Sequence, residues 1–403
     1  MSAPACPVEP EIVLDLSRLL SRILHRTPTG VDRVEMAYAE QLMRIAPERL
    51  RFGAVHPTGL YGRIPPATAA AFLAEIRAGW SGVERAAVPR ATVARLLWTM
   101  RPRPLPRPGA RRVFLQSSPH HLHDERLVRG ILLRENAGLV CLLHDLIPIE
   151  YPEYARPGGG ALHRRRIMTV ARLADAAIAN SEATRRAFLP YPRAAGREID
   201  VHVAHLGLDA PRRAVTPATA DRPYFLCLGT IEPRKNHLLL LNIWRAMAAA
   251  AGPEAVPKLV IVGRRGWENE QVIDMLDRCP ALRDTVEEHA GLPDDRMRAM
   301  MAGARALLMP SFAEGYGMPV TEALALGVPV LCGDIPAMRE AGGEAPDYLD
   351  PLDGLGWRQA ILDYAAPASP RRARQVARIA DWTAPTWADH IDIVLRAIEG
   401  LER

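Results

Sequence analysis

The sequence predicts an α/β protein of two domains, each a parallel sheet covered by helices. Short apolar runs alternate with helical patterns along the chain, which is typical of parallel strands joined by crossover helices. The 403 residues exceed the size of about 250–300 residues at which single hydrophobic cores stop growing. A stretch at 207–223 that is rich in Pro, Ala and Thr has the composition of an exposed linker between the two halves.

Five strands are predicted in the first half, each an apolar run of strand length. They cover 11–17, 51–55, 111–117, 138–145 and 175–181, and amphipathic helices are predicted at 31–45 and 161–174. No G-x-G-x-x-G pattern follows the first strand, where the turn RTPTGVDRV contains only Gly30. This absence disfavours a nicotinamide dehydrogenase, because that class uses the glycines to bring its backbone close to the pyrophosphate.

The second half repeats the pattern with five further strands and an amphipathic C-terminal segment at 382–403. The two halves therefore predict two Rossmann-like domains that face each other. The strands are expected at 223–230, 258–264, 285–291, 306–311 and 329–334, and the helices at 237–251, 269–279, 294–304, 320–327 and 335–343.

Composition favours a cytoplasmic protein. No apolar run approaches the roughly 18 residues that a membrane helix needs, and the N-terminus lacks a basic region followed by an apolar one. The five cysteines show no C-x-x-C spacing, and three of them lie in apolar runs. Reduced, packed thiols are therefore expected.

Of the 51 basic residues, only Lys235 and Lys258 are lysines, and the formal net charge is +5. The arginines are scattered and not interleaved with aromatic residues, which disfavours nucleic acid as a partner. The basic surface is compatible with peripheral contact to anionic lipid headgroups. The Arg/Pro run at 101–112 fits either a solvated connector or a loop that touches the membrane.

Arg234 and Lys235 follow the strand at 223–230 and come just before a helix. Open parallel sheets bind ligands at the carboxyl ends of their strands. Two cations beside the N–H groups of a helix start suit a di-anion such as pyrophosphate. Basic residues are otherwise disfavoured at a helix N-terminus, so this pair indicates a binding site.

Glu314 and Glu322 flank a glycine-rich turn after the strand at 306–311. Pro319 fits the first position of a helix, which would place Glu322 near its third position, where a carboxylate caps the helix. A carboxylate there also suits a ribose diol, and both readings stay open. Glu314 precedes the helix, where Gly315 and Gly317 let the backbone approach a ligand that offers hydroxyl groups. Neither task needs a metal ion, and the chain contains no D-x-D.

Three motifs follow one another along the chain: E-P-R-K-N, then a strand that ends in G-R, then E-x7-E. With these motifs in this order, the sequence resembles the retaining glycosyltransferases of family 4, which have the GT-B fold. The resemblance is strongest across 223–353, through LGTIEPRKN, LVIVGRRGW, HAGLPDDRM, LLMPSFAEGYGMPVTEALALGVPV and DYLDPLD. It extends more weakly to TPTGVDRV, LLHDLIPIEYPEY and ADAAIANSEATRRAF. Those strings look like bacterial mannosyl- or rhamnosyltransferases that build surface polysaccharides.

The resemblance implies roles for the residues that match the family pattern. Arg234 and Lys235 would bind the donor diphosphate, Glu322 the nucleotide ribose, and Glu314 hydroxyls of the donor sugar. His144, in LLHDLIP, would lie near donor sugar and acceptor, although a histidine after a buried strand is also often purely structural. The remaining donor-binding residues implied are Gly30, Thr230, Gly263, Arg264, Gly315, Tyr316, Gly317 and Met318.

The resemblance further implies an acceptor-binding domain at 1–212, joined by a C-terminal helix at about 386–403, and a nucleotide-sugar-binding domain at 220–385, with a cleft between them. The expected reaction is metal-independent hexosyl transfer from a nucleotide sugar, with GDP-mannose favoured, to a glycan or lipid-linked oligosaccharide. It needs no cofactor, and it would occur in the cytoplasm or at the cytoplasmic face of the inner membrane. A dTDP-rhamnose or UDP-hexose donor stays open, as do a GT-B epimerase and a non-catalytic nucleotide-sugar-binding protein. Oligomeric state, acceptor and linkage are not indicated.

Overall fold

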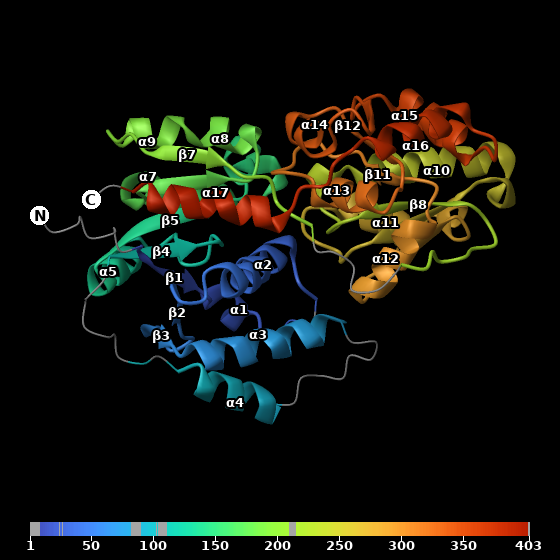
Figure 1. The fold of residues 1–403 in the computed structure, drawn as a ribbon. Coiled ribbons are helices and arrows are strands. Elements are labelled where there is room, and N and C mark those ends of the chain that lie inside the picture. Colours follow the sequence, from blue (N-terminus) through green and yellow to red (C-terminus); the bar gives the residue numbers. More distant parts are fainter. Residues whose placement is uncertain are drawn as a thin grey trace, which may run out of the picture. The chain divides into compact units, whose positions relative to one another are not determined.

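The computed structural model describes residues 9–23, 25, 27–81, 90–101, 103, 111–208 and 215–401 (Figure 1). Unit 1 comprises Met1–Leu146, Ala161–Gly207 and Trp387–Arg403, and unit 2 comprises Ile147–Gly160 and Leu208–Thr386. The segment 147–160 thus groups with unit 2, whereas the predicted boundary assigned it to the first domain. Most of the Arg/Pro run, at 102 and 104–110, and part of the predicted linker, at 209–214, lie outside the described residues.

Unit 1 is built on a seven-stranded sheet of order β3-β2-β1-β4-β5-β6-β7. All neighbours pair in parallel except β2 and β3. The five predicted strands are confirmed, whereas β3 and β7 were not predicted, because both are four-residue edge strands with polar residues in them. The strands are β1 (Glu11–Asp15), β2 (Leu50–Val55), β3 (Tyr61–Ile64), β4 (Arg112–Gln116), β5 (Ala137–Leu143), β6 (Ala176–Ala179) and β7 (Asp200–Val203).

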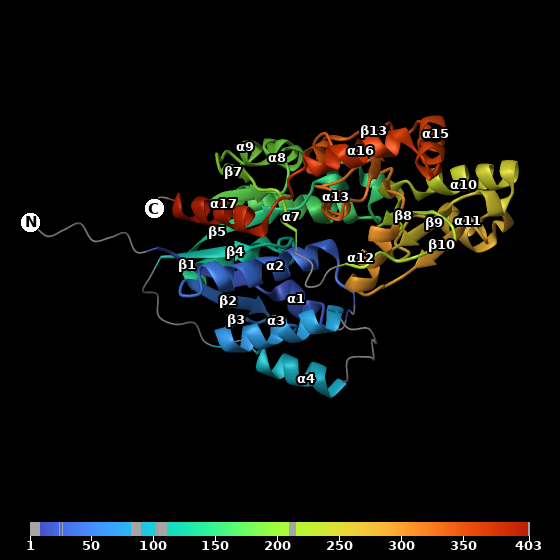
Figure 2. The same cartoon turned by 45° about the vertical axis from the view of Figure 1, so that its right-hand side comes forward.

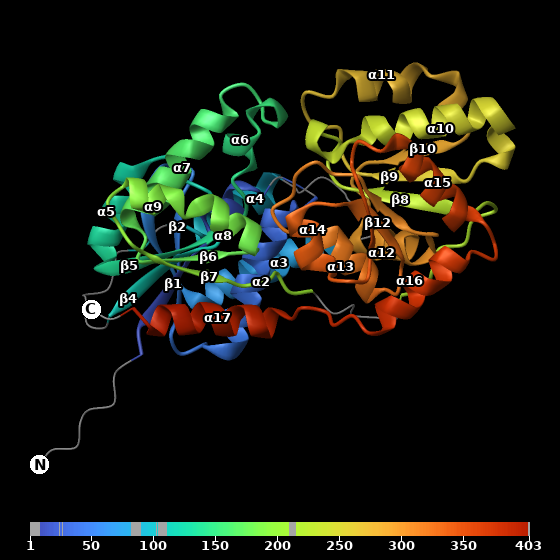
Figure 3. The same ribbon diagram turned by 90° about the horizontal axis from the view of Figure 1, so that it is seen from above.

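Helix α17 (Trp387–Glu399) completes unit 1 although it follows unit 2 in the sequence (Figure 3). It packs against α2, β6 and β7. The His390 side chain lies inside this contact, with Nε2 2.6 Å from the Tyr38 hydroxyl and Nδ1 3.1 Å from the Ala204 carbonyl oxygen. The other helices of this part of the chain are α1 (Ser17–Ser21), α2 (Gly30–Ile45), α3 (Pro66–Ser81), α4 (Arg90–Thr99), α5 (Glu125–Glu135), α7 (Gly159–Leu173), α8 (Glu182–Phe188) and α9 (Pro190–Ala194).

Unit 2 has a six-stranded, fully parallel sheet of order β10-β9-β8-β11-β12-β13 (Figure 2). The predicted strands are confirmed, and the three-residue β13 is additional. The strands are β8 (Tyr224–Leu228), β9 (Lys258–Val262), β10 (Val286–His289), β11 (Leu307–Met309), β12 (Val330–Gly333) and β13 (Asp347–Leu349). The helices are α6 (Ile147–Glu150), α10 (His237–Ala251), α11 (Glu270–Arg278), α12 (Asp294–Gly303), α13 (Met318–Ala325), α14 (Pro336–Gly342), α15 (Gly354–Ala365) and α16 (Pro370–Ala380).

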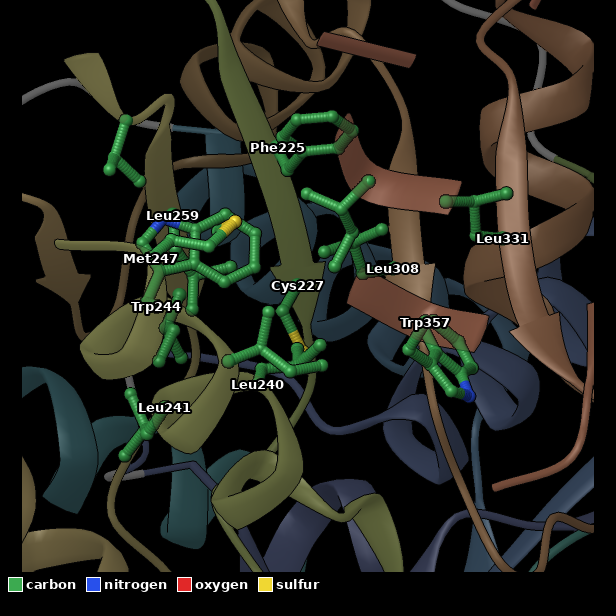
Figure 4. Packing of buried hydrophobic residues seen from close by; sticks show 14 of the residues in the cluster. Phe225, Cys227, Leu240, Leu241, Trp244, Met247, Leu259, Leu308, Leu331 and Trp357 are labelled. Atoms are coloured by element: carbon green, nitrogen blue, oxygen red, sulfur yellow. The ribbon is translucent and has the colours of Figure 1, made fainter. Parts of the chain in front are cut away.

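The core of unit 2 forms where α10 and α15 bury apolar side chains against the sheet (Figure 4). Trp244 of α10 and Trp357 of α15 are fully buried. Each indole N–H donates to a backbone carbonyl, to Pro257 at 2.7 Å and to Asp350 at 3.0 Å, so neither nitrogen is left unsatisfied. Cys141, Cys227 and Cys332 are buried free thiols in β5, β8 and β12, as predicted, and Cys6 lies outside the described residues.

Both strand orders reverse once, between β1 and β4 in unit 1 and between β8 and β11 in unit 2. The chain leaves the two central strands at such a reversal in opposite directions. A crevice therefore forms outside the carboxyl ends of these strands, and ligands bind in crevices of this kind. The residues that follow β8, β11, β1 and β4 are therefore the first to examine for function. Among the described residues, no helix combines the length and apolar character that crossing a membrane requires.

Candidate functional site

The connection from β8 to α10 carries the predicted pair of cations. Arg234 and Lys235 lie in a single 3-10 turn, Pro233–Lys235, which is followed by Asn236 in the left-handed region at φ 56°. Helix α10 then begins at His237, and no side chain caps its start. The prediction that both cations immediately precede a helix is therefore confirmed.

Glu314, in the loop after β11, accepts hydrogen bonds from both cations. Its carboxylate lies 2.7 Å from Arg234 Nη1, pairs with Lys235 Nζ, and accepts a 2.8 Å hydrogen bond from the Ser311 hydroxyl. Burial opposes ionisation of this carboxyl, but the charges of Arg234 and Lys235 outweigh it and lower the pKa of Glu314 to about 2. The structure thus brings together three of the residues predicted from the sequence.

Glu232 is a fourth charged member of this cluster that the sequence analysis overlooked. Its carboxylate lies 2.6 Å from Arg234 Nη2, and the residue is 5% exposed. Burial raises the pKa of Glu232 in spite of Arg234 and Lys235. Glu232 is the first residue of the EPRKN motif. Its place beside two cations at the end of a strand could have identified it as a member of the site.

The four formal charges of the cluster cancel, because two cations face two carboxylates. The charges of Arg234 and Lys235 are therefore already neutralised in the free protein, and their predicted binding of a diphosphate stays a prediction. Arginine offers five donors and lysine three, so both can hold a second anion beside Glu314. A bound diphosphate would accept some of the hydrogen bonds that the carboxylates now accept from Arg234 and Lys235. The Glu314 oxygens released in this way could then accept hydrogen bonds from hydroxyl groups.

Glycines at the ends of β8 and β9 make room for Lys235. Gly229 has φ +140°, and the Lys235 side chain passes its α-carbon with Cε 3.3 Å from where a β-carbon would lie. A β-carbon on Gly263 would lie 1.8 Å from the Gly229 carbonyl oxygen. Gly263 is thus required by backbone packing, and its predicted contact with the donor stays a prediction. Thr230 is half-buried and Arg264 exposed, and their donor-binding roles also stay predictions.

The position of Glu322 differs from the prediction. Gly317 is the N-cap of α13 with φ 110°, Met318 is the first helical residue, and Pro319 is the second. Glu322 is therefore the fifth residue, and the first turn of α13 contains no acidic residue. The helix-cap interpretation of Glu322 is wrong, because the helix starts one residue earlier than Pro319 suggested.

The glycine-rich turn before α13 is partly buried. Tyr316 is 4% exposed, and burial raises the pKa of its hydroxyl. A β-carbon on Gly317 would lie 3.0 Å from Met338 Sδ, so positive φ and space both favour glycine there. Gly315, Met318 and Glu322 are half-buried, and the expected amide contacts with a donor sugar stay predictions.

In unit 1, Gly30 is the exposed first residue of α2. The helix start is fixed by a capping box, in which the Thr29 hydroxyl accepts from the Asp32 N–H and Asp32 accepts from the Thr29 N–H. Asp32 also pairs with Arg18 at 2.7 Å. Among the described residues, apart from its chain neighbours and the backbone of its own helix, no atom lies within 4 Å of where a β-carbon on Gly30 would be, so this local packing does not require a glycine.

His144 directly follows β5 and links the ends of three strands. Its Nε2 lies 2.8 Å from the Ser117 carbonyl oxygen, and the Asn180 amide donates to the His144 carbonyl at 2.8 Å. Burial lowers the pKa of His144, so the ring is neutral near pH 7. Because Nε2 must donate to the Ser117 carbonyl, Nδ1 is an acceptor.

Three buried polar atoms at the ends of β4 and β6 have no hydrogen-bond partner among the described residues. They are Ser117 Oγ, Gln116 Oε1 and Asn180 Oδ1, on residues that are at most 3% exposed. Buried polar groups are nearly always hydrogen-bonded, so these atoms are able to hydrogen-bond a water molecule or a ligand. Sequence reasoning missed these residues, although Gln116 to Ser117 and Asn180 stand at the ends of predicted strands.

Two carboxyl groups are buried beside this region. Asp15 ends β1 and Glu35 lies on α2, and they are 3% and 0% exposed. Burial raises the pKa of Asp15 to about 6. Burial and then the charge of Asp15 raise the pKa of Glu35 to about 8, against a 3.1 Å hydrogen bond from the Leu19 N–H. Glu35 is therefore protonated at neutral pH.

Replacing Glu35 by Gln is expected to flatten the pH dependence of stability. In the unfolded chain a glutamate has a pKa of about 4.3, so the native protein binds the extra proton between about pH 4 and the native pKa of about 8. The free energy of unfolding therefore falls as pH rises through this window. Between about pH 6 and about pH 8.5 the wild type should lose about 2 kcal/mol more than Glu35→Gln.

Urea unfolding at the two pH values measures this difference, and Glu48→Gln, at an exposed position, is the control. The same loss in the wild type and in Glu35→Gln would show that Glu35 is ionised in the native state.

Comparison with known proteins places unit 2 in a family. Residues 211–345 match the family model Glycosyl transferases group 1, so unit 2 carries a domain of that family. The chain is 28% identical to the serotype-specific mannosyltransferase WbdA of Escherichia coli over 250 residues, which are 57% of this chain and 30% of that protein. It is 34% identical to O-antigen chain mannosyltransferase B of Escherichia coli over 131 residues, 32% of this chain and 33% of that protein. The matched regions thus span about a third of the length of these relatives.

Solved structures confirm the predicted fold class, an α/β protein of the GT-B fold. The Anabaena protein Alr3699/HepE in complex with UDP-glucose has a TM-score of 0.62 at 16% identity, over 97% of this chain and 98% of that chain. The α,α-trehalose 6-phosphate synthase of Burkholderia multivorans has a TM-score of 0.59 at 12% identity, over 98% and 99% of the two chains.

Proposed function

We propose that this chain, whose second unit carries a group 1 glycosyl transferase domain, transfers a hexosyl residue from a nucleotide sugar to a glycan or lipid-linked glycan in bacterial polysaccharide assembly. Mannose is the favoured sugar and GDP-mannose the favoured donor, because the relatives include mannosyltransferases, two of them named for O-antigen chains. The structural neighbour crystallised with UDP-glucose supports a nucleotide sugar as the class of donor.

The observation that carries this proposal is the cluster of Arg234, Lys235 and Glu314 at the β8/β11 reversal. It lies inside the matched domain, at the carboxyl ends of the central strands, where open α/β sheets bind ligands. A nucleotide sugar carries a diphosphate and several hydroxyl groups. The cluster has hydrogen-bond donors that suit the diphosphate and a carboxylate that suits the hydroxyl groups.

During transfer, negative charge develops on the departing diphosphate. Arg234 and Lys235, held in place by Glu314 and Glu232, would stabilise this charge without a metal ion. Glu314 accepts hydrogen bonds from Arg234 and Lys235 in the free protein and would accept them from sugar hydroxyls in the bound state, and a carboxylate engaged in this way is a poor nucleophile. Retention through a front-face route, in which the leaving phosphate takes the acceptor proton, is therefore favoured. Glu322 would bind the ribose, and His144 would offer Nδ1 to a sugar hydroxyl.

The proposed site of action is the cytoplasm, with peripheral contact at the cytoplasmic face of the inner membrane. Two other classes share the same nucleotide-binding chemistry. An epimerase would alter the sugar without an acceptor, and a regulatory binding protein would bind the nucleotide without turnover.

A thermal-shift screen of donors tests the proposal. A donor present at about 100 times its Kd should stabilise the native state by about 2.7 kcal/mol, and GDP-mannose should separate from UDP-hexoses and dTDP-rhamnose. Product analysis follows with the stabilising donor. A transferase releases nucleoside diphosphate rapidly only when an acceptor is present, an epimerase converts the sugar alone, and no turnover indicates a binding protein. Absence of stabilisation by every nucleotide sugar would contradict the proposed function.

A further inference from the structure

The segment 147–160 leaves unit 1 after β5 and packs as part of unit 2. Two contacts attach it there. The Trp267 indole N–H donates to the Tyr154 carbonyl at 2.9 Å, and the Arg156 guanidinium lies 5.1 Å above the Trp267 ring. The segment consists of α6, the 3-10 turn Pro152–Tyr154 and the start of α7.

Three aromatic rings form a row on this part of unit 2. The Tyr154 ring stacks on Phe312 with centroids 6.0 Å apart and planes 12° apart. Tyr151 stacks on Tyr154 at 5.7 Å and 22°. Tyr151 stays 40% exposed, and Tyr154 and Phe312 are half-buried. Tyr154 and Arg156 already attach the segment, so the exposed Tyr151 is not needed for that purpose.

The row ends on the loop that carries Glu314. The Phe312 N–H donates to the Arg234 carbonyl at 2.8 Å, and the next residue, Ala313, accepts from Arg234 Nη1 at 2.9 Å. Two residues after Phe312, Glu314 accepts from both cations of the cluster. A ligand stacked on the row would therefore lie beside the proposed donor site.

The aromatic rings of the row and the carboxylate near them favour a neutral sugar as the ligand. The face of an aromatic ring is negative and attracts C–H groups, and a pyranose offers a face of C–H groups with hydroxyls around its rim. Glu153 lies two residues after Tyr151 in the sequence. Burial raises the pKa of the Tyr154 hydroxyl, and the nearby Glu153 carboxylate raises it further. Carboxylates accept hydrogen bonds from hydroxyls and repel phosphate groups. A neutral sugar therefore fits better than the base of a charged nucleotide.

We propose that Tyr151, Tyr154 and Phe312 form a stacking platform for a pyranosyl unit of the acceptor glycan. This inference rests on the proposed function, because it names the class of acceptor at that site. The platform would hold a sugar through stacking and through hydroxyl contacts to Glu153, and it would favour acceptors with a sugar unit over a bare lipid.

The test compares Tyr151→Ala, Tyr151→Phe and the wild type in the full chain. Mannotriose is the sugar probe, followed by ligand-observed NMR titration, and GDP and UDP are the nucleotide probes, followed by calorimetry. Tyr151→Ala should raise the Kd for mannotriose by about three- to ten-fold, and Tyr151→Phe should keep it within about two-fold, because it retains the ring. The Kd for the nucleotide that the wild type binds should not change.

Trp98→Ala is the matched control, because Trp98 is an aromatic residue of unit 1 that is 68% exposed, and this variant should bind mannotriose like the wild type. An unchanged Kd for mannotriose in Tyr151→Ala, or a raised Kd for the nucleotide, would overturn the platform. If the wild type binds a nucleotide but not mannotriose, the platform is wrong and the proposed function stands. If it binds neither, both are wrong.

Discussion

Lys235→Ala should lower kcat/KM by roughly 30- to 1000-fold, which corresponds to about 2–4 kcal/mol of transition-state stabilisation. The ammonium group is buried beside Glu314 and lies next to Gly229, so its removal takes one of the two cations away from the proposed diphosphate site. Arg234→Ala should have an effect of the same size. Steady-state kinetics with the donor found in the screen provide the measurement.

The sequence supplies its own control for this experiment. Lys258, the only other lysine, begins β9 at the amino end of the strand and pairs with Glu287. Lys258→Ala removes the same charge away from the cluster and should leave kcat/KM within about two-fold, because exposed ion pairs contribute little. In Lys235→Ala, Glu314 keeps Arg234 and Ser311 as partners, so thermal unfolding should show a folded protein. Wild-type kcat/KM in both Lys235→Ala and Arg234→Ala would refute the assignment of the cluster.

Gly263→Ala should destabilise unit 2 by about 3 kcal/mol, the upper end of the usual cost of overpacking. The new β-carbon would lie 1.8 Å from the Gly229 carbonyl oxygen, and a backbone carbonyl cannot rotate away as a side chain does. The strand ends must separate, which also moves Gly229 away from Lys235. Calorimetry should show a lower Tm, and the donor should bind more weakly.

Gly130→Ala makes the same chemical change at a site with space. Gly130 is inside α5, and in the described part of the chain no atom beyond its neighbours and its own helix backbone lies within 4 Å of where its β-carbon would be. This variant should gain about 0.4–1 kcal/mol, because alanine loses less backbone entropy on folding than glycine does. Equal Tm values for Gly263→Ala and the wild type would mean that the ends of β8 and β9 are less closely packed than the structure shows.

The sequence predicted the sheets well where strands are apolar runs, and less well at the edges. The central strands β1, β4, β8 and β11 carry continuous apolar residues because both faces of a parallel sheet are covered. The edge strands β3, β7 and β13 are three or four residues long, and polar residues within them hide the strand pattern. Their pairing depends on neighbours that a local pattern does not contain.

At the candidate site the sequence predicted the residues better than their interactions. Arg234, Lys235 and Glu314 were identified, but the pairing of Glu314 with both cations was not predicted. That pairing joins residues 79 and 80 positions apart in the sequence, and it follows from the adjacency of β8 and β11. Glu232 escaped notice for the same reason, because its burial depends on the folded loop. Local patterns likewise placed the start of α13 at Pro319, whereas Gly317 caps the helix.

The placement of α17 also fixes the order in which the chain matures during synthesis. Unit 1 includes residues 387–399, which pack against α2, β6 and β7, whereas unit 2 ends at Thr386. The ribosome adds about 5–20 residues per second. While it makes unit 2, the surface of α2, β6 and β7 that α17 covers in the folded protein therefore stays exposed. Helix α17 therefore covers this surface only after unit 2 has been made.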